Sequence, residues 1–346
     1  MTPFTKGIPL AVPDAPQIAG LVFRSLAGED DYKRIAAVLN ASETANGVRT
    51  AANADDVRNT YTHLTNCDLE RDFVLVEHLG KAIAYGRCEW AQQEDGEMNY
   101  LHLVHVIPAW RRRGIGTSLL RYLQARLAQY AGENPQVGAH NLSTWINGVS
   151  PGAVALLTGD GYRPDRYGYG MVRSLAEPLP DAPLPSGIEV RRVDPEHFRL
   201  IWEADVEAFR DHPGYVPPTE TDYDRWLSDP VIIQPALWQI AWDAERNEIA
   251  GQVRTFISAD ENTKLNRKRG YTEFISTRRP WRRQGLARAL LVRSMEILKQ
   301  QQMEEAALGV DAQNPNGALQ LYESVGFQVE SRSTRFQRPV DRQPAY

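Results

Sequence analysis

The residues best suited to chemistry lie between Glu273 and Phe327. A strand-like segment runs into a basic turn that contains a glycine, Arg282-Arg283-Gln284-Gly285-Leu286-Ala287. Apolar residues then recur at helical spacing, at Leu286, Leu290, Leu291, Met295 and Leu298. The turn therefore lies at a helix N-terminus, where unpaired backbone N–H groups and the helix dipole favour an anion such as a phosphate. Gly285 lets the backbone approach a bulky ligand.

The same arrangement occurs earlier in the chain. The segment Val104–Gly116, VHVIPAWRRRGIG, parallels Ile275–Ala287, ISTRRPWRRQGLA, and each copy opens a predicted helix. The strand-like segments around Arg24 and Arg191 also match, as do the ends from Ser150 to Tyr162 and from Asn314 to Phe327. A repeat that covers nearly the whole chain predicts a duplicated domain.

The proline-rich stretch EPLPDAPLPSG, residues 177–187, separates the copies and favours a stiff, extended conformation. We therefore expect an N-terminal domain over 1–177, a linker over 178–187 and a C-terminal domain over 188–346. In the first domain the patterns predict strands at 21–26, 72–77, 81–90, 98–106, 141–146 and 166–173, and helices at 29–41, 54–66, 114–130 and 151–158. In the second they predict strands near 237–243, 248–258, 270–277 and 305–311. Mixed strands and helices give an α/β (α+β) fold class.

Composition narrows the classes of function. The 346 residues carry a net charge of −5, so we expect no nucleic-acid binding. The basic segments Arg111-Arg112-Arg113 and Lys264–Arg269 are explained by a phosphate site and by a charged hairpin tip, respectively. No apolar run could span a bilayer, and the proline-broken N-terminus does not resemble a signal peptide. Two cysteines, Cys67 and Cys88, favour a reducing cytoplasm.

The order of strand, [QR]-x-x-G-x-[GA] loop, helix and N-P-x-G-A-L-x-L-Y-x-x-x-G-F motif resembles the GNAT superfamily of N-acetyltransferases. The resemblance implies acetyl-CoA as co-substrate and two tandem domains, each with a mixed, mostly antiparallel sheet flanked by helices. We infer no metal, because the histidines are scattered along the chain. His102 and His105 point to opposite faces of their strand and make a poor metal pair. A solvated basic helix start is the other explanation of each loop.

The resemblance also implies which residues contact acetyl-CoA. In the second copy they are Ile275, Ser276, Thr277, Arg282, Arg283, Gln284, Gly285, Leu286, Ala287, Arg288 and Asn314. In the first copy they are Val104, His105, Val106, Arg112, Arg113, Gly114, Ile115, Gly116 and Thr117. Tyr322 is implied as the general acid, and Glu273, on the strand beside the acetyl group, is the candidate general base. Both have structural alternatives, since Tyr322 could be core and Glu273 could face solvent.

The two copies differ at the position of the acid. Aligning Gly161-Tyr162 with Gly326-Phe327 puts Leu157 opposite Tyr322, and leucine cannot protonate a thiolate. Asn314-Pro315 and Ser150-Pro151 each predict a helix start, and Gly326 a left-handed helix end. The layout resembles the mycothiol synthase group of tandem GNAT proteins, which implies catalysis in the C-terminal domain. An active N-terminal domain stays open, because its Val-Ile-Pro-Ala-Trp loop fits the family pattern better.

Acidic and aromatic residues around Glu203–Tyr215, together with Trp226, would suit a cationic amine, although a solvated acidic helix face explains them equally well. We therefore expect an acetyl-CoA-dependent N-acetyltransferase that acts on a small-molecule primary amine by direct attack, as a monomer or homodimer without membrane or nucleic-acid partners. The alternatives are a non-catalytic acyl-CoA-binding sensor or scaffold, and a protein N-acetyltransferase.

Overall fold

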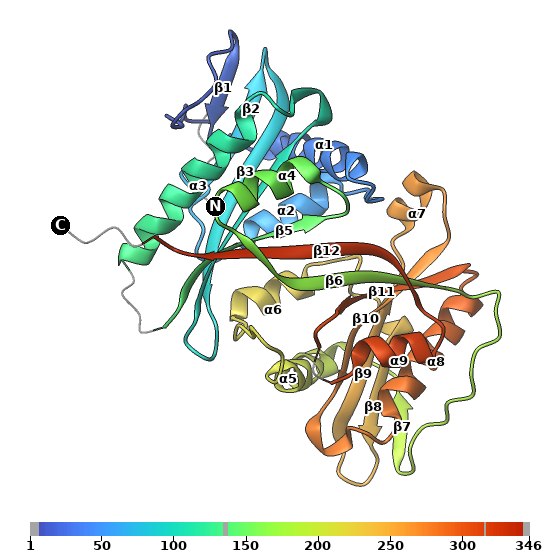
Figure 1. Cartoon of the computed structure of the whole chain (residues 1–346). Helices are drawn as coiled ribbons and strands as arrows, with labels where there is room; N and C mark the ends of the chain where they lie inside the picture. Colours follow the sequence, from blue (N-terminus) through green and yellow to red (C-terminus); the bar gives the residue numbers. More distant parts are fainter. Residues whose placement is uncertain (1–6, 134–137, 315, 342–346) are drawn as a thin grey trace. The chain divides into compact units, whose positions relative to one another are not determined.

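The computed structural model describes residues 7–133, 138–314 and 316–341. The chain forms two compact units, one of Met1–Arg166 with Ser333–Tyr346 and the other of Tyr167–Arg332. Each unit has a central sheet with helices against it, as Figure 1 shows with the chain coloured from blue to red. The sequence repeat is thus visible as two units of the same element order.

The sheet of the first unit has the order β1-β2-β3-β4-β5-β12. Its strands are β1 (Leu21–Arg24), β2 (Phe73–His78), β3 (Lys81–Gln92), β4 (Met98–Val106), β5 (His140–Asn147) and the C-terminal part of β12 (Gln328–Pro339). Neighbouring strands are antiparallel except for the parallel pair β4 and β5. That pair is joined through Met98–Leu101 only, so the two strands separate beyond Leu101 and Ser143.

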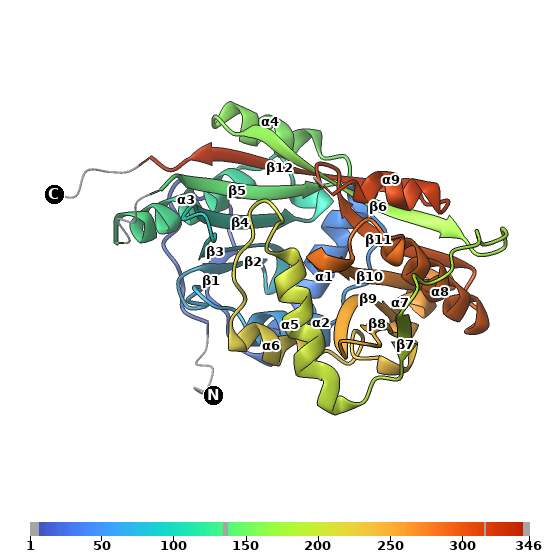
Figure 2. The same cartoon turned by 90° about the horizontal axis from the view of Figure 1, so that it is seen from below.

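Helices cover both faces of this sheet. The helices α1 (Glu29–Ala45) and α2 (Ala54–Thr62) bury Tyr32, Ile35 and Tyr61 against Phe73 and Leu75. On the opposite face, α3 (Ile115–Glu133) packs its leucine side chains against the sheet. The helix α4 (Pro151–Gly159) adds Leu157 to the same core. Figure 2 shows α1 and α2 on one side of the strands and α3 with α4 on the other. Alternation of apolar residues along β2 to β4 supplies both faces.

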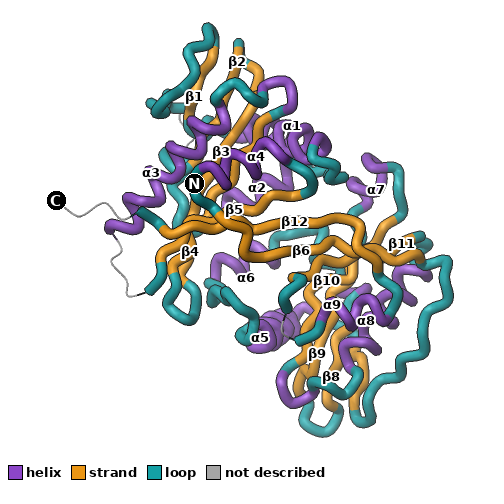
Figure 3. The backbone as a smooth tube through the Cα atoms, in the orientation of Figure 1, coloured by secondary structure: helices purple, strands orange, loops and turns teal. Residues whose placement is uncertain are grey.

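The second unit repeats this plan with the sheet order β7-β8-β9-β10-β11-β6. Its strands are β7 (Ile188–Arg191), β8 (Gln239–Asp243), β9 (Glu248–Phe256), β10 (Arg269–Thr277), β11 (Glu305–Asp311) and most of β6 (Arg163–Ser174). The parallel pair β10 and β11 is joined through Arg269–Tyr271 and then separates. The tube of Figure 3 shows these strands in orange beside the purple helices.

The helices α5 (Phe198–Phe209) and α6 (Glu220–Leu227) pack with Trp238 and Ile240, and α8 (Leu286–Gln300) and α9 (Ala318–Ser324) pack with the core around Leu290 and Leu308. Short 3₁₀ turns are η1 (Pro108–Trp110), η2 (Pro195–His197), η3 (Pro235–Leu237) and η4 (Arg279–Trp281). The capping box of Thr219 and Asp222 explains why α6 begins where it does.

The two units exchange their last strands. Residues Ser333–Pro339 of β12 pair with β5 of the first unit, although they come last in the described chain. Residues Gly168–Ser174 of β6, which follow the first copy of the repeat, pair with β11 of the second unit. Phe336 and Val340 accordingly lie in the core of the first unit. The expected linker at 178–187 separates the two copies of the repeat along the sequence. The compact units have different boundaries, because each of them includes a strand from the other copy.

The α/β fold class and the tandem layout are confirmed, and nearly every predicted strand and helix is present. Residues 264–269 are not simply a hairpin tip, because α7 (Ala259–Leu265) with Ser258 as its N-cap fills the connection from β9 to β10. Asn314 is not the N-cap of α9, which begins after Gly317 at a φ of 73°; Pro315 lies outside the described residues. Gly326 has the expected left-handed conformation, at a φ of 92°.

Candidate active site

The phosphate loop of the second unit connects β10 to α8. It passes through η4, and then Arg283 (φ 61°) and Gly285 (φ 83°) take left-handed conformations before α8 begins at Leu286. A Cβ atom at Gly285 would meet nothing within 4 Å, so the space above the loop is open. The first turn of α8 begins beside that space, and the first N–H groups of a helix have no partners within it, as an anion site requires.

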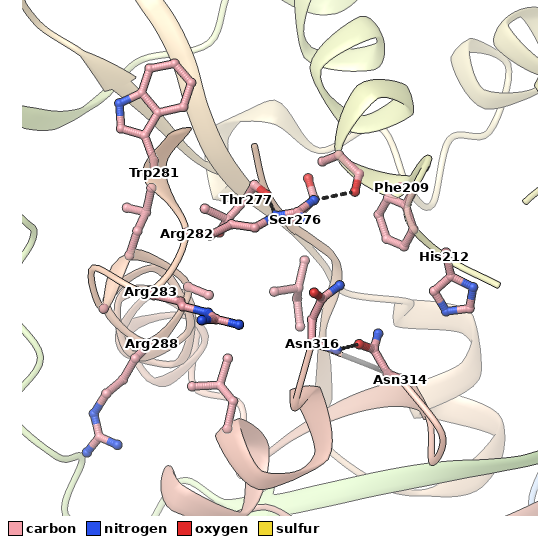
Figure 4. Close-up of a pocket in the computed structure, with 16 residues that line it drawn as sticks. Phe209, His212, Ser276, Thr277, Trp281, Arg282, Arg283, Arg288, Asn314 and Asn316 are labelled. Carbon is pink, nitrogen blue, oxygen red and sulfur yellow. Dashed lines mark hydrogen bonds between the residues drawn. The ribbon is translucent and has the colours of Figure 1, made fainter. Parts of the chain in front are cut away.

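A cavity of about 360 Å³ lies over this loop. Figure 4 shows Arg283 pointing into it from the start of α8, with Asn314 and Asn316 across from it, whereas the guanidinium of Arg288 points away. The residues that line it include most of the predicted set: Ile275, Ser276, Thr277, Arg282, Arg283, Gly285, Leu286, Ala287, Arg288 and Asn314. Gln284 is not among them and donates instead to the carbonyl of Pro280.

Arg282 has a different surrounding from Arg283. Its guanidinium donates to the carbonyls of Thr277 (2.9 Å) and Ala208 (3.0 Å) and to the carboxylate of Asp211 (2.6 Å). In the first unit Arg111 makes the matching bonds, to the carbonyls of Val106 (3.1 Å) and Ser42 (3.0 Å). The first arginine of each loop thus ties the loop to the C-terminal end of α5 in the second unit and of α1 in the first. This leaves Arg283 and the backbone N–H groups to meet a phosphate.

The strand β10 is irregular next to the site. Its pairing with β9 shifts register between Glu273 and Ser276, and Phe274 has a φ of 51°, a conformation rare for a bulky residue. The bulge lies next to Ile275, Ser276 and Thr277, which line the cavity. Thr277 lines the cavity there, and its buried Oγ1 has no hydrogen-bond partner among the described residues. A hydroxyl in this position is free for a ligand.

Glu273 lies in the gap between the separated strands. Its Oε1 accepts a hydrogen bond of 2.8 Å from the backbone N–H of Gly309 on β11. Burial raises the pKa of Glu273 to about 7, and the bond from Gly309 opposes the rise only in part. The side chain is half-buried and does not face bulk solvent as an ordinary outward strand residue would. A carboxyl with such a pKa is well placed to exchange protons near neutral pH.

Tyr322 lies on α9, packed at its edge against Phe327 with the ring centroids 6.4 Å apart. It is 6% exposed and belongs to the core of the second unit. Burial, and then the charge of Glu273, raise the pKa of its phenol well above the ordinary value. The phenol therefore keeps its proton at neutral pH. Neither Tyr322 nor Glu273 is among the residues that line the cavity, which ends short of them.

The first unit has a cavity of about 700 Å³ in the corresponding place. Its lining includes the predicted residues Val104, His105, Val106, Arg112, Gly114, Gly116 and Thr117. Ile115 is buried in the core, and Arg113 stacks over the ring of Trp110 instead. Gly114 has a φ of 84°, like Gly285. Ser150 precedes α4 with Pro151 in the first turn, as predicted, and Leu157 lines the cavity.

The strand β4 of the first unit has no bulge. It pairs with β3 without interruption from Met98 to Val106, and His102, at the position of Glu273, is bonded to the hydroxyl of Tyr162 at 2.8 Å. Burial lowers the pKa of His102 to about 3 and that of His105 to about 4, so both are neutral. The two units therefore share the phosphate loop and differ around the reacting group.

The carboxylates expected to attract an amine in the second unit are engaged by arginines of the chain. Glu207 binds Arg278 at 2.7 Å, and Asp211 binds both Arg279 and Arg282. Asp205 binds Arg254, which is 1% exposed and stacks 4.0 Å over Phe274. Sequence patterns did not indicate Arg254, Phe274 or Gly309, because a bulge and the partner across a gap depend on strand register.

The fold is that of acetyltransferases. The model of the acetyltransferase (GNAT) family matches residues 41–143 and 197–327, and the chain belongs to this family. The family uses acetyl-CoA as co-substrate, so the protein is an acyltransferase.

Curated relatives include a mycothiol acetyltransferase of Geodermatophilus obscurus, 28% identical over 85% of this chain and 89% of that protein. A mycothiol acetyltransferase of Salinispora arenicola is 30% identical over 67% of this chain and 71% of that protein. Among solved structures, a GCN5-related N-acetyltransferase from Sphaerobacter thermophilus is 27% identical with a TM-score of 0.68, over 97% of this chain and 98% of that one. A tandem GNAT protein of clavulanic acid biosynthesis shares the fold, at 15% identity and a TM-score of 0.65, over 94% of this chain and 100% of that one.

Two negative findings concern only the residues that the structure describes. No helix among them is long and apolar enough to cross a membrane. No three histidine, cysteine or acidic side chains in the described ranges are grouped so that they could hold a metal ion.

Proposed function

We propose that the protein transfers the acetyl group of acetyl-CoA to a small-molecule primary amine, and that the second unit carries out the reaction. The observation that carries this assignment is the combination of a bulge in β10, the carboxyl of Glu273 in the strand gap and Tyr322 nearby. The first unit has a continuous β4 and Leu157 instead. The mycothiol acetyltransferases among the relatives favour a small-molecule acceptor over a protein.

In the proposed mechanism the pyrophosphate of acetyl-CoA rests on the N–H groups between Arg283 and Arg288, with Arg283 adding its charge. The pantetheine arm follows Ile275–Thr277 into the gap between β10 and β11. The backbone N–H near Thr277 and its unpartnered hydroxyl are available to hydrogen-bond the thioester end of the ligand. Binding thus places the thioester carbonyl near Glu273.

The amine, which is an ammonium ion near neutral pH, first gives up one proton to the ionised Glu273, directly or through water. Its nitrogen then attacks the thioester carbonyl, so a C–N bond forms and the C–S bond breaks, without an acyl-enzyme intermediate. Tyr322 gives its proton to the departing thiolate, and the second proton, which the nitrogen loses as the amide forms, restores the Tyr322 phenol. Because a thiol has a pKa of about 8.5, the leaving group is only weakly basic, and loss of the acid should slow turnover without abolishing it.

Matched glycine variants test which unit turns over. Gly285→Ala and Gly114→Ala strain equivalent loops, since both glycines have nearly the same positive φ and neither Cβ would clash. We expect Gly285→Ala to raise the KM for acetyl-CoA and Gly114→Ala to leave it unchanged. Thiol release from acetyl-CoA, with pools of small amines as acceptors, is the measurement.

Tyr322→Phe should lower kcat about ten- to a thousand-fold in the same assay. An effect of Gly114→Ala on turnover, with none from Gly285→Ala or Tyr322→Phe, would place catalysis in the first unit. Binding of acetyl-CoA without thiol release in any pool would instead favour a sensor. Both cysteines are free, which fits the cytoplasmic location that we expect.

A further inference from the structure

The bulge of β10 lies opposite buried polar side chains of β9. Glu273 is the Cα partner of Arg254 on that strand. The next pair is Ser276 with Gln252, so β10 has one more residue than β9 between the two pairs. A positive φ at a bulky residue such as Phe274 is unfavourable and persists only where the surrounding structure holds it. The side chains opposite the bulge must therefore supply interactions that hold Phe274 in this conformation.

Arg254 contacts the first end of the bulge. Its guanidinium carbon lies 4.0 Å from the centre of the Phe274 ring and 5.1 Å from that of Trp226, so the cation is enclosed between two aromatic rings. Asp205 on α5 is its ion-pair partner, and its Nε and Nη1 atoms have no hydrogen-bond partner among the described residues. A buried ion pair adds little net stability, because desolvation offsets the attraction. This favours a role in holding Phe274.

Gln252 contacts the other end of the bulge. Its fully buried amide nitrogen donates to Oγ of Ser276 at 3.2 Å and to the carbonyl of Ile201 on α5 at 3.3 Å. Burial raises the pKa of Asp205, whereas the neighbouring side chain of Ser276 opposes the rise, so this carboxyl lies beside the same serine. The polar trio of Asp205, Gln252 and Arg254 thus connects both ends of the bulge to α5.

The first unit has neither the bulge nor a matching trio. Its strands β3 and β4 pair without interruption, and the partners of the two β4 histidines are Cys88 and Tyr85. Both are uncharged at neutral pH, because burial raises the pKa of each well above its ordinary value. Arg87, which lies between them, is engaged by Glu89 and by the ring of Tyr61. The bulge and the trio therefore occur together in one unit and are both missing at the matching positions of the other.

From these observations we propose that the polar trio positions Glu273, because it holds the bulge of β10 and so keeps this carboxyl in the gap between β10 and β11. The inference rests on the proposed function, in which Glu273 is the base. The hydrogen bond from the N–H of Gly309 marks the position that the trio maintains. Without the trio, Phe274 should relax to an ordinary extended conformation, which turns Glu273 away from Gly309.

The double variant Asp205→Leu, Arg254→Met tests this role. It replaces a buried ion pair by apolar residues of similar size, a change that keeps most folds stable. In the thiol-release assay, with the amines that wild type acetylates, kcat should fall about ten- to a hundred-fold, since a displacement of about 1 Å at the reacting group has effects of this size. The KM for acetyl-CoA should stay within about three-fold of wild type, because the phosphate loop is unchanged.

Two measurements separate positioning from general damage. The rising limb of kcat/KM, near pH 7 in wild type, should move toward the ordinary carboxyl pKa of about 4.3 once Glu273 leaves the gap. The amide of Gly309 should exchange with deuterium at least about ten-fold faster, as measured by NMR. A smaller fraction of active molecules would lower kcat without changing either. The matched control is Thr255→Val, the next residue of β9, which is equally buried but bonded to Ser294 of α8. It should change neither measurement.

If the double variant fails to fold by circular dichroism, Gln252→Leu decides. It removes the bond to Ser276 and should lower kcat about two- to ten-fold, with both measurements moving in the same direction. Unchanged Gly309 exchange in whichever variant is folded would overturn the proposal. So would an unmoved pH limb when Glu273→Gln has confirmed the base. If Glu273→Gln keeps the wild-type pH profile, the proposed base is wrong, and Gly309 exchange alone then decides whether the trio positions the carboxyl.

Discussion

At the scale of single residues, Glu273 makes the sharpest prediction. As a general base it must be deprotonated, and burial raises its pKa to about 7. We therefore expect kcat/KM to rise with pH through about 7 and then to level off. Glu273→Gln should abolish this limb along with most of the activity. A pH profile in wild type that stays flat between about pH 6 and pH 8 would contradict the role of base.

The same residue should affect stability. The folded chain binds the proton of Glu273 more tightly than the unfolded chain, so the free energy of unfolding falls as pH rises from about 4.5 to about 7 and stays lower above that. Glu273→Gln should thus be more stable than wild type at pH 8 by about 1–2 kcal/mol, and nearly equal to it at pH 4. Urea unfolding at the two pH values measures the difference. A variant that is less stable at pH 8 would show that the carboxylate is satisfied.

At the scale of elements, the ion pair of Asp205 and Arg254 joins α5 to β9 next to the bulge of β10. Arg254 is fully enclosed between the rings of Trp226 and Phe274. Asp205→Leu should destabilise the chain by about 3–5 kcal/mol, because it leaves a buried charge without its partner. Chemical denaturation of the double variant Asp205→Leu, Arg254→Met is the control. It should recover much of the loss, and no recovery would mean that packing alone explains the effect.

Most helices and strands could be predicted from the sequence, because they depend on patterns among residues that are close together in the chain. The loop residues at Gly114 and Gly285 and the apolar stripes after them depend on short-range patterns, so the helices and strands beside them were predicted nearly to their ends. The bulge at Phe274 and the contact of Glu273 with Gly309 depend on register between distant strands, which no local pattern records. Asn314 was misassigned as a cap because Gly317 supplies the turn instead.

At the scale of the whole molecule, the exchanged strand β12 makes the stability of the first unit depend on the far end of the described chain. Phe336 is 4% exposed in the core of that unit, and Phe327 is 2% exposed in the core of the second. Phe336→Ala should cost about 3–5 kcal/mol. It should increase hydrogen exchange in β3 to β5, while Phe327→Ala should do so in β10 and β11. Faster exchange of β10 and β11 in Phe336→Ala alone would contradict this division.

The same exchange sets an order for biosynthesis. Everything that the second unit needs, from Tyr167 to Arg332, has been translated before Ser333 is added, whereas the sheet of the first unit lacks its edge strand until β12 follows. At about 5–20 residues per second, the first unit waits roughly 10–30 s on the ribosome for that strand. During that interval β5 offers an open edge to other nascent chains. The unit that is synthesised first therefore completes its sheet last. We expect chaperones to bind this unit for longer than the second during synthesis.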